Sequence, residues 1–130
     1  MRIFFFFCAL VFLCSCRQKC QNDFQARAQV ITMELIAELQ QIDDLDMLIE
    51  ASSRLSAQFD ALVDVMIEAR KWQIKKNAVW TLSERDHQLS RQLAFELSRL
   101  LRNPLARHFL EKAQNPALER LDAFEKKVAG

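Results

Sequence analysis

Ser83, His87 and Ser90 have side chains that can take part in catalysis, and their spacing places them on one face of an expected helix. A hydroxyl and an imidazole on one face can form a nucleophile and its base, but no acid is placed opposite them to orient the base. Glu84 and His87 have the i, i+3 spacing found in di-iron helical bundles. Such sites need this motif twice, with glutamates from two further helices, and the chain has one copy. A solvated helix face is the simpler interpretation.

Met33 and His108 are the second pair with distinctive chemistry, as axial ligands of haem. His108 lies one turn after Leu105 and beside Phe109, so we expect it to border the core. Small haem-binding four-helix cytochromes use a Met from the first helix and a His from the last. The chain resembles them in size and architecture, without a haem motif. Met33 lies off the apolar stripe of its helix, so a histidine bonded to backbone or water is the favoured interpretation.

Glycine is almost absent, and the one glycine, Gly130, is the last residue. The chain therefore has no phosphate-binding loop, no dinucleotide fingerprint and no nucleophile elbow, because all three require glycine. It also has no Cys-x-x-Cys-His motif for haem attachment and no His-Glu-x-x-His motif for zinc. We expect a protein without enzymatic activity, cofactor or metal. The alternatives are a haem- or metal-binding four-helix bundle and an enzyme of unrecognised type.

The first 16 residues differ in composition from the rest. Met1-Arg2 precedes an unbroken apolar run over residues 3–13. A transmembrane helix needs about 20 apolar residues, and this shorter run has the length of the apolar part of a signal peptide. The run closes with Leu13-Cys14-Ser15-Cys16.

These four residues resemble the bacterial lipobox, which has an aliphatic residue, two small residues and an obligatory cysteine. The resemblance implies that residues 1–15 are cleaved and that Cys16 carries diacylglycerol on its thiol, often with an added acyl chain such as palmitate. Cys20 cannot replace Cys16, because Arg17 would then stand at the aliphatic position. Cys20 is left without an intrachain partner, as a tolerated thiol or in an intermolecular disulfide. An ordinary signal peptide cut nearby is the alternative.

The remaining residues, 16–130, have balanced charge, with 17 basic and 17 acidic side chains. Nucleic-acid binding requires a basic surface, so we expect no nucleic-acid partner. Glycine and tyrosine are scarce or absent and proline occurs twice, which disfavours hairpin turns and strands. The composition predicts an all-helical domain over residues 23–130, joined to Cys16 by a short tether over residues 16–22.

Apolar residues recur every three or four positions, which predicts helices with one buried face. The first helix is expected from about Asp23, the second from Asp43-Asp44 to about Lys76, and the third to about Arg102. The second helix has the clearest apolar stripe: Leu45, Leu48, Ile49, Leu55, Phe59, Leu62, Val63, Met66 and Ile67.

Two kinds of pattern predict where helices begin. Thr81 and Glu84 fit a capping box, with Thr81 as the N-cap of the third helix. Asn103-Pro104 and Asn115-Pro116 each combine an N-cap asparagine with proline at the first helical position. The expected fold is an up-and-down helical bundle of four long segments, the last broken at Pro116. A single helix kinked at Pro116 is the alternative.

Trp72 and Trp80 are the candidate centre of a partner-binding surface. Trp72 lies off the main stripe of the second helix, and Trp80 lies in a connection, where binding residues are common. The basic residues around them are Arg70, Lys71, Lys75 and Lys76. The alternative is that both tryptophans close the end of the bundle. The basic residues also suit a helix C-terminus through the helix dipole, or could bind anionic lipid.

Together these features predict a small lipid-anchored helical protein of the bacterial cell envelope. We expect it to bind a protein partner or to serve a structural role, with the membrane reached through its lipid anchor. Secretin pilotins are similar in anchor, size and helix content. Because Arg17 and not Asp follows Cys16, the outer membrane is the expected location in a Gram-negative bacterium.

Overall fold

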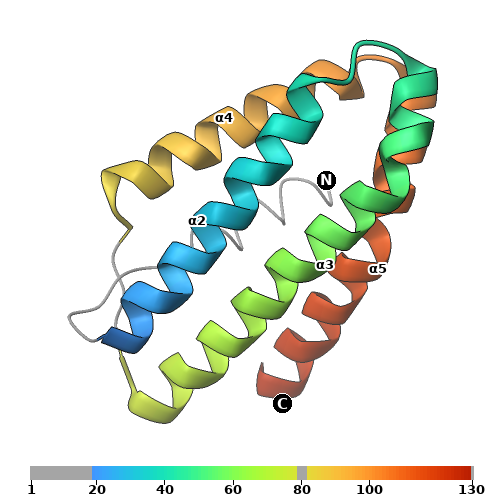
Figure 1. Ribbon diagram of the computed structural model, residues 1–130. Coiled ribbons are helices and arrows are strands. Elements are labelled where there is room, and N and C mark those ends of the chain that lie inside the picture. Colours follow the sequence, from blue (N-terminus) through green and yellow to red (C-terminus); the bar gives the residue numbers. More distant parts are fainter. Residues whose placement is uncertain (1–18, 79–81, 130) are drawn as a thin grey trace.

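The computed structural model describes residues 19–78 and 82–129, with side chains from Asp23 onward (Figure 1). Four helices make up most of these residues: α2 (Lys19–Gln40), α3 (Leu45–Lys76), α4 (Glu84–Leu101) and α5 (Pro104–Ala129). No strand occurs within the described ranges. The predicted all-α class and up-and-down bundle are confirmed.

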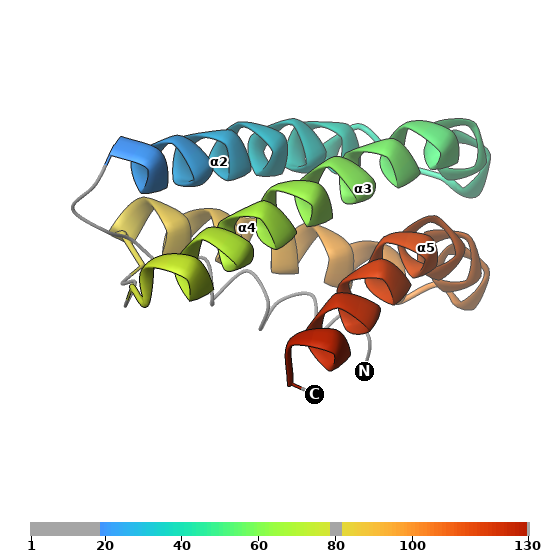
Figure 2. The same ribbon diagram turned by 90° about the horizontal axis from the view of Figure 1, so that it is seen from below.

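The helices form two antiparallel hairpins, α2–α3 and α4–α5, stacked one on the other (Figure 2). α2 packs on α3 and α4, and α5 packs on the same two helices. Helices α2 and α4 run in parallel, since Gln25 bonds to Asp86 near one end and Leu39 to Arg99 near the other. Successive helices run in opposite directions along the bundle. The consecutive helices α3 and α4 lie diagonally across the bundle from each other and do not form one of its main packing contacts.

Helix α3 is buried on two sides because α2 and α5 both pack against it. The predicted stripe is largely confirmed, and Phe59 at its middle is fully buried. Val65 and Ala69, which lie off that stripe, are buried as well. Three positions that apolar spacing predicts to be buried are exposed instead. Ile49 in the stripe of α3 is 42% exposed, and Leu105 and Val128, near the two ends of α5, are 60% and 38% exposed.

The starts of α3 and α4 show which capping residues the chain uses. Asp44 caps α3, as predicted, by accepting a 2.8 Å hydrogen bond from the Met47 amide. The predicted cap of α4 is wrong by two residues, and Thr81 lies outside the described residues. Ser83 is the N-cap, and its capping-box partner is Asp86. Both Thr81-x-x-Glu84 and Ser83-x-x-Asp86 fit the pattern, so spacing alone could not separate them.

Helix α5 continues through Pro116, so the break expected there does not occur. The single-helix alternative is the correct one, and Asn115 lies inside the helix instead of starting a new one. Proline cannot donate the helical hydrogen bond to the carbonyl oxygen of Lys112. Because Lys112 and Pro116 are both exposed, water can serve that oxygen.

Helix α2 begins at Lys19, before the expected start near Asp23, and so includes part of the expected tether over residues 16–22. The expected signal peptide and Cys16 lie outside the described residues. Across the described helices, none combines the length and the apolar character needed to cross a membrane.

Candidate functional site

The candidate partner-binding residues lie in the last turns of α3, beside the start of α2 (Figure 1). Trp80 lies outside the described residues. Asn77 ends the helix in the left-handed conformation, with φ 49° and ψ 45°, and its amide donates to the carbonyl oxygens of Gln73 and Ile74. Asparagine is one of the few residues other than glycine that adopt this conformation readily. The last turn therefore stays regular and presents Lys75 and Lys76 at its end.

Trp72 is partly buried against α2. Its ring centroid lies 6.4 Å from that of Phe24, and it packs in a small cluster around the fully buried Ala69. Val65, Ala69 and Trp72 follow one another at helical spacing, so Trp72 continues the second buried side of α3. This packing favours the interpretation in which Trp72 closes the bundle end.

The four basic residues of the candidate surface have different surroundings. Arg70 is partly buried and donates a 3.0 Å hydrogen bond to Oε1 of Gln73. Lys71 is exposed, with its Nζ 5.9 Å from the centroid of the Phe124 ring in α5, a distance at which a cation is attracted to the ring face. Lys75 and Lys76 are exposed. Three of these four basic residues are thus exposed, whereas Trp72, one of the two residues of the expected apolar centre, is packed.

Two of the residues considered for catalysis, Ser83 and His87, lie at the start of α4. Ser83 is the N-cap, and its hydroxyl lies 2.8 Å from Oδ2 of Asp86. His87 is exposed, and its backbone amide donates to the carbonyl oxygen of Ser83. The chemistry that the structure gives Ser83 is therefore that of a helix cap.

Met33 and His108 do not face a common space. Met33 is 47% exposed, and its sulfur lies 3.6 Å from Nη2 of Arg85. The expectation that His108 borders the core is wrong, because it is exposed in the first turns of α5, with its ring against that of Phe109. Among the described residues, no group of three His, Cys, Asp or Glu side chains could hold a metal ion.

Two polar residues that the sequence patterns missed connect α2 to α4. Besides capping α4, Asp86 accepts hydrogen bonds from the side-chain amides of Gln25 and Gln29, the second at 2.8 Å. At the other end of the pair, Arg99 donates to the carbonyl oxygens of Leu39, at 2.7 Å, and Ile42, at 3.0 Å. These bonds cross between helices, and no local spacing indicates them.

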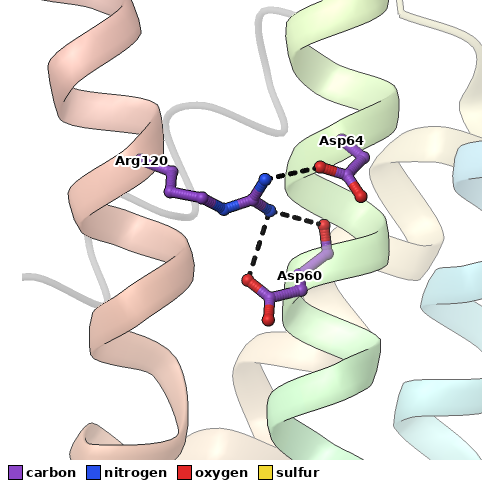
Figure 3. Close-up of polar contacts among 3 residues, drawn as sticks. All are labelled: Asp60, Asp64 and Arg120. Carbon is purple, nitrogen blue, oxygen red and sulfur yellow. Dashed lines mark hydrogen bonds and ion pairs between the residues drawn. The ribbon is translucent and has the colours of Figure 1, made fainter.

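Arg120 connects α5 to α3 (Figure 3). It forms ion pairs with Asp64, at 2.7 Å, and Asp60, at 3.2 Å, and also donates to the carbonyl oxygen of Asp60. The hydrogen bond to Asp64 raises the pKa of the Arg120 guanidinium above its ordinary value. This network and Pro116 line a shallow groove between the two helices, and because Arg120 is already paired there, we interpret the network as structural.

Comparison of the chain with protein-family models, curated proteins and solved structures gave no match.

Proposed function

We propose that the chain is the precursor of a lipid-anchored, non-enzymatic helical protein of the bacterial cell envelope that binds a protein partner or serves a structural role there. The observation that carries the proposal is the sequence Leu13-Cys14-Ser15-Cys16 directly after an apolar run. The thiol of Cys16 is the nucleophile that would take the diacylglycerol, and residues 1–15 would be removed.

The bundle that follows supports this role in two ways. First, α2 begins at Lys19, so about 11 Å of extended chain at most separates Cys16 from the folded domain. Second, Ser83 and Asp86 are engaged in capping α4, and Asp86 also in a contact with α2. A compact module held close to a membrane suits a binding or supporting role.

The decisive experiment follows acylation in cells. Labelled palmitate should enter the wild-type protein, and Cys16→Ser should abolish the label and leave unprocessed or mislocalised precursor. Cys20→Ser is the matched control, because it removes the next cysteine and should retain the label. Undiminished palmitate incorporation into Cys16→Ser would refute the lipid anchor.

For the location we propose the outer membrane of a Gram-negative bacterium, where the domain would face the periplasm. Arg17 after the modified cysteine supports this, because aspartate at that position retains many lipoproteins in the inner membrane. A role like that of the secretin pilotins fits the anchor, the size and the helical fold. Membrane fractionation tests the location, and co-fractionation with inner-membrane markers would contradict it. Crosslinking in intact envelopes tests for the protein partner.

A further inference from the structure

The lysines and arginines of the bundle have different surroundings. Among the residues whose side chains are described, from Asp23 onward, each ion pair uses an arginine and none uses a lysine. Five of the six unpaired lysines lie near the C-terminal ends of α3 and α5, whereas Lys112 lies in the first half of α5. We call the group of five the basic edge: Lys71, Lys75, Lys76, Lys126 and Lys127. All five are exposed.

The two helix ends that form the basic edge lie at the same end of the bundle. α5 runs parallel to α3, as the pairing of Arg120 with Asp60 and Asp64 and the approach of Lys71 to Phe124 show (Figures 1 and 2). Glu125 is an acidic residue within the edge, and positive charge still predominates there. At the opposite end of α3, Asp43, Asp44 and Asp46 are exposed, together with Arg102 and Arg107 at the junction of α4 and α5, so that end carries charges of both signs.

The start of α2 lies at the basic end. Phe24 contacts Trp72, and Arg27 forms a 3.0 Å ion pair with Glu68, so the first turns of α2 pack against the last turns of α3. Cys16 is three residues before the first residue of α2. A lipid on Cys16 would therefore hold the start of α2, beside the basic end, close to the bilayer, since the chain from Cys16 to Lys19 reaches about 11 Å at most. This reach is comparable to the Debye length of about 8 Å in physiological salt.

We propose that the basic edge docks on anionic phospholipid headgroups and fixes the orientation of the bundle on the membrane. The inference rests on the proposed lipid anchor. Lysines close to an anionic bilayer surface are attracted to it, and salt screens that attraction. Ile74, which is 47% exposed, and Val128, which is 38% exposed, place apolar side chains among these lysines and can enter the headgroup region. The opposite end and the flanks of the bundle then face away from the membrane.

Two pairs of residues allow a matched test of this orientation. Ile74 and Met47 are similarly exposed at opposite ends of α3, so Ile74→Cys and Met47→Cys, each combined with Cys20→Ser, can carry an environment-sensitive dye. The processed lipoprotein is reconstituted into vesicles of phosphatidylcholine, with or without phosphatidylglycerol. We expect the dye at position 74 to shift to the blue and to lose quenching by acrylamide in the anionic vesicles at low salt only. The dye at position 47 should remain accessible throughout.

Reversing the charge of lysines in the basic edge is a second test of the docking. Each lysine near an anionic surface should favour the docked orientation by about fivefold. Lys75→Glu with Lys76→Glu removes two attractions and adds two repulsions, and should lower the ratio of docked to undocked protein roughly several hundredfold. Arg102→Glu with Arg107→Glu changes the net charge equally at the far end and should leave the dye at position 74 protected. Circular dichroism confirms that each variant is folded.

Each outcome has one meaning. A protein that floats with both kinds of vesicle but keeps position 74 exposed in the anionic ones would overturn the docking and leave the anchor standing, with the lysines available to an acidic protein partner. The docking would also be overturned if the dye at position 74 were equally protected in neutral and in anionic vesicles, or if Lys75→Glu with Lys76→Glu left that protection unchanged. A protein that does not float with any vesicle refutes the anchor, and the docking with it.

Discussion

The ring centroids of Trp72 and Phe24 lie 6.4 Å apart, with the rings inclined by 60°, and this contact joins the first turns of α2 to the last turns of α3. Trp72 is partly buried and belongs to the packing of the bundle end. Trp72→Ala should therefore lower the free energy of unfolding by about 2–4 kcal/mol, somewhat less than at a fully buried site. Chemical denaturation of the variant measures this loss.

Ile74→Ala, two positions further along α3, is the control. Ile74 is 47% exposed, so its truncation should change stability by less than about 0.5 kcal/mol. A Trp72→Ala loss as small as that of Ile74→Ala would show that Trp72 does not close the bundle and would return it to the candidate partner-binding surface.

Two phenylalanines test the core face of the bundle. Phe59 is fully buried, whereas Phe95 on α4 is 65% exposed. Phe59→Ala should cost about 3–5 kcal/mol, because it removes a large buried side chain and leaves a cavity. Phe95→Ala should cost less than about 1 kcal/mol. Similar denaturation midpoints for the two variants would contradict the assignment of the core.

Arg99 tests the contact between α2 and α4. Arg99→Met removes two hydrogen bonds to the carbonyl oxygens of Leu39 and Ile42, and it leaves Glu96, whose side chain is 10% exposed, without its ion pair. We expect a loss of about 2–3 kcal/mol in stability. Adding Glu96→Gln should recover part of it, since the buried charge is then removed. Arg91→Met, at an exposed ion pair, should be nearly neutral. Additive effects of the Arg99 and Glu96 changes would argue against coupling.

Replacing Pro116 is expected to increase the stability of the protein, whereas the preceding substitutions decrease it. It stands inside α5, exposed, where it interrupts the helical hydrogen-bond pattern. Pro116→Ala should stabilise the protein by about 1–2 kcal/mol, since alanine restores the missing donor. Pro104→Ala, at the first residue of the same helix, should give no such gain, because proline is well accommodated there. A lower melting temperature for Pro116→Ala would show that the bundle depends on the proline.

The sequence was sufficient for features that one helix determines by itself. The apolar period places Phe59 in the core, and Asp44 caps α3 through its own side chain. The cap of α4 was misplaced because its choice depends on α2. Asp86, unlike Glu84, also accepts hydrogen bonds from Gln25 and Gln29 in that helix. A local pattern contains no information about such a contact.

The candidate surface shows the same limit. Trp72 lies off the main apolar stripe, and a helix with one buried face would expose it. α3 is instead covered by two neighbours, so the positions of Val65, Ala69 and Trp72 form a second packed side. Which helices are neighbours depends on the stacking of the two hairpins, and apolar periodicity does not specify that stacking. Lys75 and Lys76, at the end of the helix, were correctly expected on the surface.

Arginine and lysine have different roles in this bundle: arginines form the ion pairs that join helices, and lysines supply the positive charge of the basic edge. Within the described residues the ion pairs that join helices use arginine, while the exposed primary amines of the basic edge take part in none of them. A reaction confined to amines, such as acetylation, would therefore neutralise that edge and leave these ion pairs between helices intact, although it would weaken the attraction of Lys71 to the Phe124 ring. The charge of this edge can therefore change while the ion pairs that join the helices persist.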